Sequence, residues 1–325
     1  MRDSNLIKLA FVLVGAGLIG LFLTFGLGFS DLNDDIEFEK QWEFSADSFN
    51  EISILSSYMV DVQFVPSTNE RSTIHIEGKA AEEVVSKIGQ TVINGQTLVL
   101  DLKKDRFQLD LLFNLEWLSK QTVTIALAEG TTLQSLYTET GSNRITIRNA
   151  DVQKAEVRTS SGSIHVNGLK AQDNIRLHAS SGAIRAEQLT GSEIELRTSS
   201  GSIHLDSVEG NSISVESSSG AIKATEVQGD TAFRSSSGSI NLEHSGGTLQ
   251  TSSSSGSVRV TQSDVSETSV STTSGSVRLT VPRSFNGYYE ARSNSGTMRV
   301  PESKRQSEQY INVQTSSGSI RIIEN

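Results

Sequence analysis

The sequence predicts an all-β protein: a right-handed parallel β-helix, or β-solenoid, of about ten or more coils, preceded by one N-terminal transmembrane helix. A Ser-Ser-Gly tripeptide or a close variant recurs, with its glycine every 18 to 22 residues. Apolar residues alternate with small or polar ones after each glycine, which is the pattern of a strand with one buried face. Such short coils cannot bury their own apolar edges, so they must stack. The right-handed winding follows from the general handedness of parallel connections. The motif glycines are Gly141, Gly162, Gly182, Gly201, Gly220, Gly238, Gly256, Gly275, Gly296 and Gly318.

Each repeat is expected to hold at least two short strands. The second and fourth residues after a motif glycine, such as Ile203 and Leu205, predict the buried face of one strand. Apolar pairs such as Ile194 and Leu196, which precede the glycine by seven and five residues, predict another. We expect Ser-Ser-Gly to form the corner between them, with glycine tolerating positive φ and the serine hydroxyls satisfying backbone groups of the turn. A second corner is predicted near Gly168, Gly191, Gly210, Gly229 and Gly247.

The region before the regular repeats, residues 41–140, predicts the N-terminal capping coils of the solenoid, and residues 141–325 are the regular repeats. Ser56-Ser57-Tyr58 parallels Ser160-Ser161-Gly162, with Tyr58 where glycine would stand. Residues 80–87 predict a short helix. The terminal coils of solenoids are atypical because they must cover an open apolar end, and the apolar run 109–118 is the best candidate for that cover.

The N-terminus carries a candidate membrane anchor. Residues 9–29 form 21 residues without a charge, which matches the roughly 20 helical residues needed to span a bilayer. Residues 1–8 contain Arg2 and Lys8, and an acidic juxtamembrane linker follows at 30–40. The positive-inside rule therefore predicts a single-pass cell-membrane protein with a cytoplasmic N-terminus and an extracytoplasmic C-terminal domain. The alternative is a cleaved signal peptide with a site at Gly26-Leu27-Gly28.

The net charge of -10 comes entirely from the first part of the chain. Residues 1–140 carry 10 Lys and Arg against 20 Asp and Glu, whereas residues 141–325 carry 18 of each. The acidic total argues against a nucleic-acid partner, which would need a net basic surface. The chain has no cysteine, which excludes disulfides, a thiol nucleophile, Cys-ligated metal centres and a lipidated cysteine.

The sequence predicts no catalytic residues, no metal site and no cofactor, and therefore a protein that is not an enzyme. Acidic residues are scattered without a calcium-binding repeat, and no G-x-S-x-G nucleophile motif occurs. His165 and His204 are equivalent residues two coils apart, about 10 Å at ~4.8 Å per coil, which is too far to share one metal. A polysaccharide-processing enzyme of solenoid type remains the alternative.

One column of the repeat has a consistent chemistry: the third residue after each motif glycine, which stacking would place in a single outward row. The row reads His165, Arg185, His204, Lys223, Asn241, Arg259, Arg278, Arg299 and Arg321. In the structural interpretation, the long stems cover the sheet and the charges pair with Glu187, Asp206 and Glu243. In the functional one, the row binds an anionic wall polymer or glycan. Its candidate residues are Arg185, Lys223, Arg259, Arg278, Arg299 and Arg321, and acidic partners are scarcest in the C-terminal half.

Ser-Ser-Gly-Ser/Ala-Ile repeats behind one membrane helix resemble the bacterial "putative adhesin" family of domains of unknown function, over roughly residues 40–325. The resemblance implies a β-solenoid outside the cell membrane, linked in some relatives to envelope stress, and it implies no catalytic residues. Relatives often have Asp after the motif glycine, where this chain has residues such as Ser163 and Ala183, which weakens any carboxylate-based site. We expect an adhesin-like binding or scaffolding surface on the cell envelope. The sequence leaves the oligomeric state open.

Overall fold

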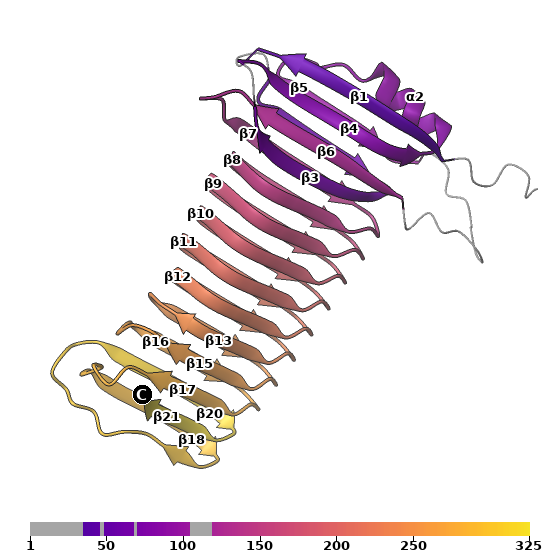
Figure 1. Ribbon diagram of the computed structural model, residues 1–325. Coiled ribbons are helices and arrows are strands. Elements are labelled where there is room, and N and C mark those ends of the chain that lie inside the picture. Colours follow the sequence, from indigo (N-terminus) through magenta and orange to yellow (C-terminus); the bar gives the residue numbers. More distant parts are fainter. Residues whose placement is uncertain (1–34, 46–48, 68–69, 105–118) are drawn as a thin grey trace, which may run out of the picture.

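The computed structural model describes residues 35–45, 49–67, 70–104 and 119–325. These residues form an all-β rod of stacked parallel coils with a distinct N-terminal cap, which confirms the predicted solenoid (Figure 1). The predicted membrane helix at 9–29 and the predicted cover at 109–118 lie outside the described residues. Within the described ranges, no helix is long and apolar enough to span a bilayer.

The central coils are five long strands, each of which pairs in parallel with the strand of the next coil. Equivalent residues of successive repeats are in register, so Ile184 pairs with Ile203 and Ile203 pairs with Ile222. Their inward apolar side chains form one continuous core. The strands are β8 (Ile145–Thr159), β9 (Ile164–Ala179), β10 (Ile184–Thr198), β11 (Ile203–Ser217) and β12 (Ile222–Ser235).

Beyond β12 each coil divides into two separate strands. The segments that follow the Ser-Ser-Gly turns continue one ladder, here named the post-turn sheet, and those that precede the turns continue the pre-turn sheet. The inner faces of both sheets bury apolar residues against the common core, so their outer faces point away from each other. The strands are β13 (Ile240–Ser245), β14 (Leu249–Ser253), β15 (Val258–Gln262), β16 (Thr268–Thr272) and β17 (Val277–Val281).

The C-terminal end departs from stacking in chain order. β20 (Tyr310–Ser317) lies between β16 and β18 (Tyr288–Ser295), and β21 (Ile320–Glu324) lies between β17 and β19 (Met298–Arg299). The last coil in the sequence is therefore the second-to-last in the rod. The repeat pattern could not show this, because equivalent residues fit either order.

The N-terminal cap continues both sheets and closes the rod with antiparallel strands and a helix. β2 (Glu51–Ser56), β3 (Met59–Pro66), β5 (Thr97–Leu102), β6 (Lys120–Leu127) and β7 (Leu133–Thr140) pair in parallel with one another or with β8. β1 (Ile36–Phe44) and β4 (Ser72–Ala80) instead run antiparallel, with β4 beside β6 and β1 at the edge.

The predicted short helix is confirmed as α2 (Glu82–Gln90), which packs against β1 and β5. It buries Val84 and Ile88 in the core, so the helix covers part of the open apolar end. Lys40 on β1 donates hydrogen bonds to the carbonyls of Ile88, Gly89 and Thr91 at 2.7, 2.9 and 3.0 Å. A cation at this position satisfies the free carbonyls of the helix C-terminus and complements its dipole.

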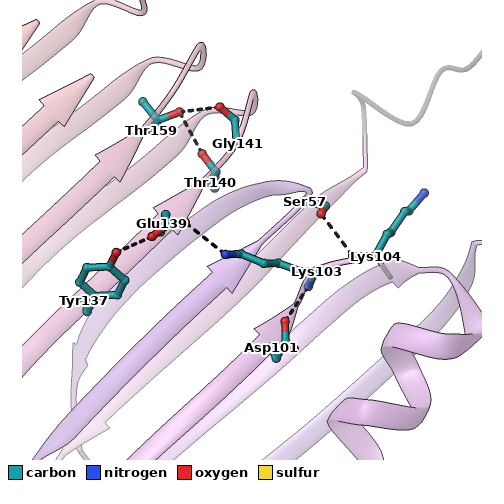
Figure 2. Close-up of polar contacts among 9 residues, drawn as sticks. All are labelled: Ser57, Asp101, Lys103, Lys104, Tyr137, Glu139, Thr140, Gly141 and Thr159. Carbon is teal, nitrogen blue, oxygen red and sulfur yellow. Dashed lines mark hydrogen bonds and ion pairs between the residues drawn. The ribbon is translucent and has the colours of Figure 1, made fainter. Parts of the chain in front are cut away.

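A polar network joins strands of the N-terminal cap to one another (Figure 2). Glu139 accepts a hydrogen bond from the Tyr137 hydroxyl and another from Lys103 Nζ at 3.1 Å. Burial, together with the hydrogen bond to Glu139, raises the pKa of Tyr137 to about 12. The amides of Lys103 and Lys104 donate to Asp101 Oδ1 at 3.0 Å and to Ser57 Oγ at 3.2 Å. Two of these contacts, Lys103 to Glu139 and Lys104 to Ser57, join residues 36 and 47 positions apart in the sequence, so no local pattern predicts them.

A buried hydroxyl three residues before the motif glycine organises most of the turns. In the repeat around Gly201, Thr198 Oγ1 accepts a hydrogen bond from the Gly201 amide at 3.1 Å and donates one to the Gly182 carbonyl of the neighbouring coil, also at 3.1 Å. Hydroxyl groups do satisfy backbone groups of the turn, but the residue responsible is the one before the Ser-Ser pair, so the assignment of this role to the serines of the tripeptide was wrong. The same amide-to-hydroxyl bond recurs at Thr159, Ser217, Ser235, Ser253 and Thr272.

None of the motif glycines from Gly162 to Gly275 has the predicted positive φ, so glycine is required at these positions for another reason. They stack so closely that a Cβ on Gly182 would lie 1.5 Å from the carbonyl oxygen of Gly162. A Cβ on Gly201 would lie 1.9 Å from the Gly182 oxygen. The prediction of positive φ was therefore wrong, because close approach of neighbouring coils is what excludes a side chain.

The second bend also differs from its predicted place. The left-handed residues that make it are Gln188, Ser207 and Glu226, with φ of 55°, 57° and 54°, each three residues before one of the predicted corner glycines. Of the predicted corner glycines, Gly168, Gly229 and Gly247 have left-handed φ themselves, at 73°, 129° and 86°. Non-glycine residues adopt this region at a modest cost, which explains why Gly191 and Gly210 did not mark the left-handed residue of their coils.

Replacing Thr198 with valine should lower the free energy of unfolding by about 2 kcal/mol, because the buried Gly201 amide loses its acceptor while the volume stays nearly constant. Ala179 is the natural counterpart, since it stands where other turns have the hydroxyl. Ala179→Ser should therefore stabilise the protein by about 1 kcal/mol. Chemical denaturation followed by circular dichroism checks both. Equal stability of T198V and the parent protein would contradict this account of the turn.

Asp61 is a strongly buried carboxylate that joins cap and rod. Its side chain is 4% exposed and accepts from Lys120 Nζ and Arg148 Nη1, both at 2.5 Å. Burial alone would raise the pKa of Asp61, but the hydrogen bonds and charges of Arg148 and Lys120 outweigh it and hold the pKa below the ordinary value of 3.8.

Asp61→Asn should cost about 2 kcal/mol at pH 7, because two cations lose their charged partner. Because the pKa of Asp61 is lower in the folded state, its charge contributes its full stabilisation above pH 3.8. This contribution is lost as the pH falls towards the folded-state pKa. The difference between D61N and the parent protein should therefore narrow in acid. Urea denaturation at pH 7 and pH 3 measures it, with Glu37→Gln at an exposed ion pair as the control. A difference that widens on acidification would refute the linkage.

Candidate functional site: an outward arginine row

The structure places the predicted basic residues in one outward row of the post-turn sheet. Register pairs run from His165 through Arg185, His204, Lys223 and Asn241 to Arg259. From there the order is Arg259, Arg278, Arg321 and Arg299, because β21 lies between β17 and β19. We call these last four residues the arginine row. The predicted chain order, with Arg299 beside Arg278, is therefore corrected.

The arginine row carries four exposed charges without an ion-pair partner in the part of the chain that the structure describes. All four side chains are exposed. Among the described residues, no ion pair involves Arg259, Arg278, Arg299 or Arg321. Four like charges thus lie on adjacent strands, spaced about 4.8 Å apart. Directly opposed like charges destabilise a sheet by roughly 0.2–1 kcal/mol per pair.

The flanking columns of the arginine row are neutral. On the turn side lie the hydroxyl residues Ser257, Ser276, Ser319 and Thr297, and the Thr297 hydroxyl donates to Ser319 Oγ at 3.2 Å. On the other side, the acidic residues of the earlier coils end at Glu243, whose partner is Thr261, followed by Thr280 and Ile323. The row is therefore a positive strip bordered by hydroxyls and one aliphatic side chain.

The N-terminal part of the basic column, from His165 to Asn241, differs from the arginine row in how its charges are paired. Arg185 pairs with Glu187 at 2.6 Å, and Glu187 also accepts from Asn167 Nδ2 at 2.9 Å. Burial, with the nearby charges of Arg144 and Arg185, lowers the pKa of His165, so this imidazole is neutral at pH 7. The structural interpretation of the basic column therefore fits Arg185. His165 and His204 lie on either side of Arg185, and no group of three His, Asp or Glu suited to a metal occurs in the described chain.

Three arginines on the outer face of the pre-turn sheet, unlike the arginine row, lie next to glutamates. Arg158 pairs with Glu156, Arg176 lies 3.6 Å from Glu195, and Arg197 lies 3.5 Å from Glu216. Like the arginine row, these residues lie on exposed outer faces of parallel strands. The contrast shows that the fold itself does not require unpaired arginines.

The comparisons with known proteins establish the family. A family model described as Toastrack DUF4097 matches residues 49–246 and 231–323, so the chain belongs to this family of domains of unknown function. The match confirms the resemblance drawn from the Ser-Ser-Gly repeats. No curated protein sequence matches the chain.

Several solved structures resemble the chain at low identity. One is described as a putative adhesin from Bacteroides fragilis, with 13% identity, a TM-score of 0.42, and coverage of 89% of this chain and 99% of that one. Another is described as a putative lipid binding protein from Parabacteroides distasonis, with 14% identity, a TM-score of 0.40, and coverage of 88% and 97%. A third, described as a putative adhesin from Parabacteroides merdae, has 11% identity, a TM-score of 0.32, and coverage of 88% and 96%.

Proposed function

We propose that this protein is a membrane-tethered, extracytoplasmic and non-enzymatic rod of the cell envelope that binds an anionic polymer through the arginine row. The observation that carries the proposal is the contrast between the two sheets. On the pre-turn sheet Arg158, Arg176 and Arg197 each lie next to a glutamate, whereas the arginine row leaves four adjacent charges unpaired. An arrangement that costs stability and exposes charge is typical of a binding surface.

The spacing of the arginine row suits a linear polyanion. Successive guanidinium groups project from neighbouring strands about 4.8 Å apart, so one extended chain of phosphates or carboxylates can contact several of them at once. Guanidinium binds such groups through paired hydrogen bonds, and the neighbouring Ser276 and Ser319 hydroxyls add further donors. The ligand class is therefore an anionic wall polymer, such as a polyol phosphate or an acidic glycan.

The tethered topology of the proposal rests on the sequence of residues 1–40. An apolar run with basic residues before it and acidic residues after it favours a membrane anchor with the rod outside the cytoplasm. The right-handed winding likewise stays a prediction from the handedness of parallel connections. Protease treatment of intact cells tests the topology, since the rod should be degraded while a cytoplasmic marker survives. Full protection of the rod would contradict it.

Binding is tested with the full-length protein in nanodiscs of phosphatidylcholine, a lipid without net charge. Immobilised poly(glycerol phosphate) is the probe and dextran is the uncharged control. We expect retention on the phosphate polymer at low ionic strength, a steep decline as NaCl is added, and no retention on dextran. Absence of retention at low ionic strength, or retention that salt does not change, would overturn the proposal.

A further inference from the structure

A groove on the pre-turn sheet forms a second candidate binding site, separate from the arginine row. It has a volume of about 400 Å³ and lies where β14, β16 and β20 approach their turns. Eleven of its twelve lining residues are Ser, Thr, Asn or Gln, and the twelfth is Arg292. Its volume falls in the usual range of ligand pockets, about 300–1,000 Å³.

The groove exists because one outward column of the pre-turn sheet changes from long to short side chains. In the earlier coils this column holds Arg197, Glu216 and Arg234, which are register partners. The next two positions are Ser252 and Ser271. Two adjacent serines in place of long charged residues leave a hollow. Gln314 and then Arg292 follow as the next register partners at the distal end.

The lining defines the chemistry of a ligand. The exposed hydroxyl and amide groups of the lining both donate and accept hydrogen bonds, and no apolar side chain lines the groove. The buried hydroxyls of Ser235, Ser253, Thr272 and Thr315 are instead bonded to backbone groups of the turns. Arg292 is neutralised by Glu290, since Nη2 of the arginine lies 2.5 Å from Oε1 of the glutamate. The lining therefore favours a ligand that carries many uncharged hydrogen-bonding groups and disfavours lipids and polyanions.

We propose that this groove binds an uncharged oligosaccharide. A sugar chain that lies along the rod can place hydroxyls against each successive coil, because the coils repeat every 4.8 Å or so. Ser252, Ser271 and Gln314 lie at the centre of this contact, and Asn294 extends it at the distal end. The groove and the arginine row lie on opposite sheets of the same coils, so the two sites can be occupied together.

The test uses the full-length protein in phosphatidylcholine nanodiscs with maltohexaose and chitohexaose as probes. Saturation-transfer NMR and calorimetry should show saturable binding of at least one of them, with a dissociation constant in the millimolar range or below. Ser271→Arg restores the long side chain of the earlier coils and should weaken binding at least 10-fold. Gln314→Ala removes an amide without filling the groove, and should also weaken binding.

Ser214→Arg is the matched control, because it adds the same side chain to the outer face of the pre-turn sheet on β11, outside the groove. It should leave binding unchanged, as should glutamine substitutions in the arginine row, which separates this site from the proposed polyanion site. Circular dichroism verifies that each variant is folded. Failure of both sugars to bind, or equal binding by folded S271R, would overturn the proposal.

Discussion

Replacing Gly182 with alanine should disrupt the stack of coils and lower the free energy of unfolding by about 4 kcal/mol, the largest stability loss that we expect from a single substitution. The added Cβ would lie 1.5 Å from the backbone oxygen of Gly162, which no rotamer change can relieve. The two coils would have to separate, and their hydrogen bonds and apolar contacts would weaken together. Chemical denaturation measures the loss, and hydrogen exchange should show reduced protection around β9 and β10.

Gly141→Ala is the matched control. Gly141 occupies the same place in the first motif, its φ is not positive, and a Cβ there would meet nothing within 4 Å. Its substitution should change stability by less than about 0.5 kcal/mol. If G141A and G182A lose the same stability, the cause is a general need for glycine in the turn, and close stacking of the coils is refuted.

Replacing all four members of the arginine row with glutamine should lower affinity for poly(glycerol phosphate) by about 100-fold at low ionic strength. The slope of log K against log salt should become shallower by up to about 4, because four cationic contacts no longer release counterions. The substitutions R259Q, R278Q, R299Q and R321Q remove unpaired, exposed charges and relieve repulsion between neighbours, so the protein should fold at least as stably as before. Binding assays over a salt series measure both quantities.

A second quadruple variant provides the control for net charge. Four other arginines lie on the outer face of the pre-turn sheet: Arg158, Arg176, Arg197 and Arg234. Changing them to glutamine lowers the net charge by the same amount, four positive charges. This variant should keep most of the affinity and a salt slope close to that of the parent protein. Equal losses in both variants would mean that the polymer responds to total charge, and the assignment of the binding site to the arginine row would fail.

The sequence predicted the solenoid and its register because the repeat is nearly regular and each coil has an obvious inward face. Ile184, Ile203 and Ile222 pair as their equivalent places in the repeat require. The outward row follows from the same period, so its members could also be named in advance. The neutral flanks of the row could be found in the same way, since Thr261 and Thr280 stand where earlier coils have Asp206 and Glu187.

Other features depend on contacts between coils, which the repeat period of the sequence does not reveal. The position of β21 between β17 and β19 makes Arg321 the neighbour of Arg278. The need for glycine at Gly182 arises from a carbonyl in another coil. The sequence does contain a signal for the groove on the pre-turn sheet: one column changes from Arg234 to Ser252 and Ser271. These residues can be recognised as one column only when the register of the strands is known.

The order of the C-terminal coils decides whether the four arginines form one continuous row, and disulfide trapping tests it most directly. The chain has no cysteine, so introduced pairs report without background. The pair R278C and R321C should oxidise readily, because neighbouring strands place the two Cα atoms about 4.8 Å apart, within disulfide range. The pair R278C and R299C, two strands apart, should stay reduced. Efficient bonding of the second pair and none of the first would contradict the inserted coil and the row built on it.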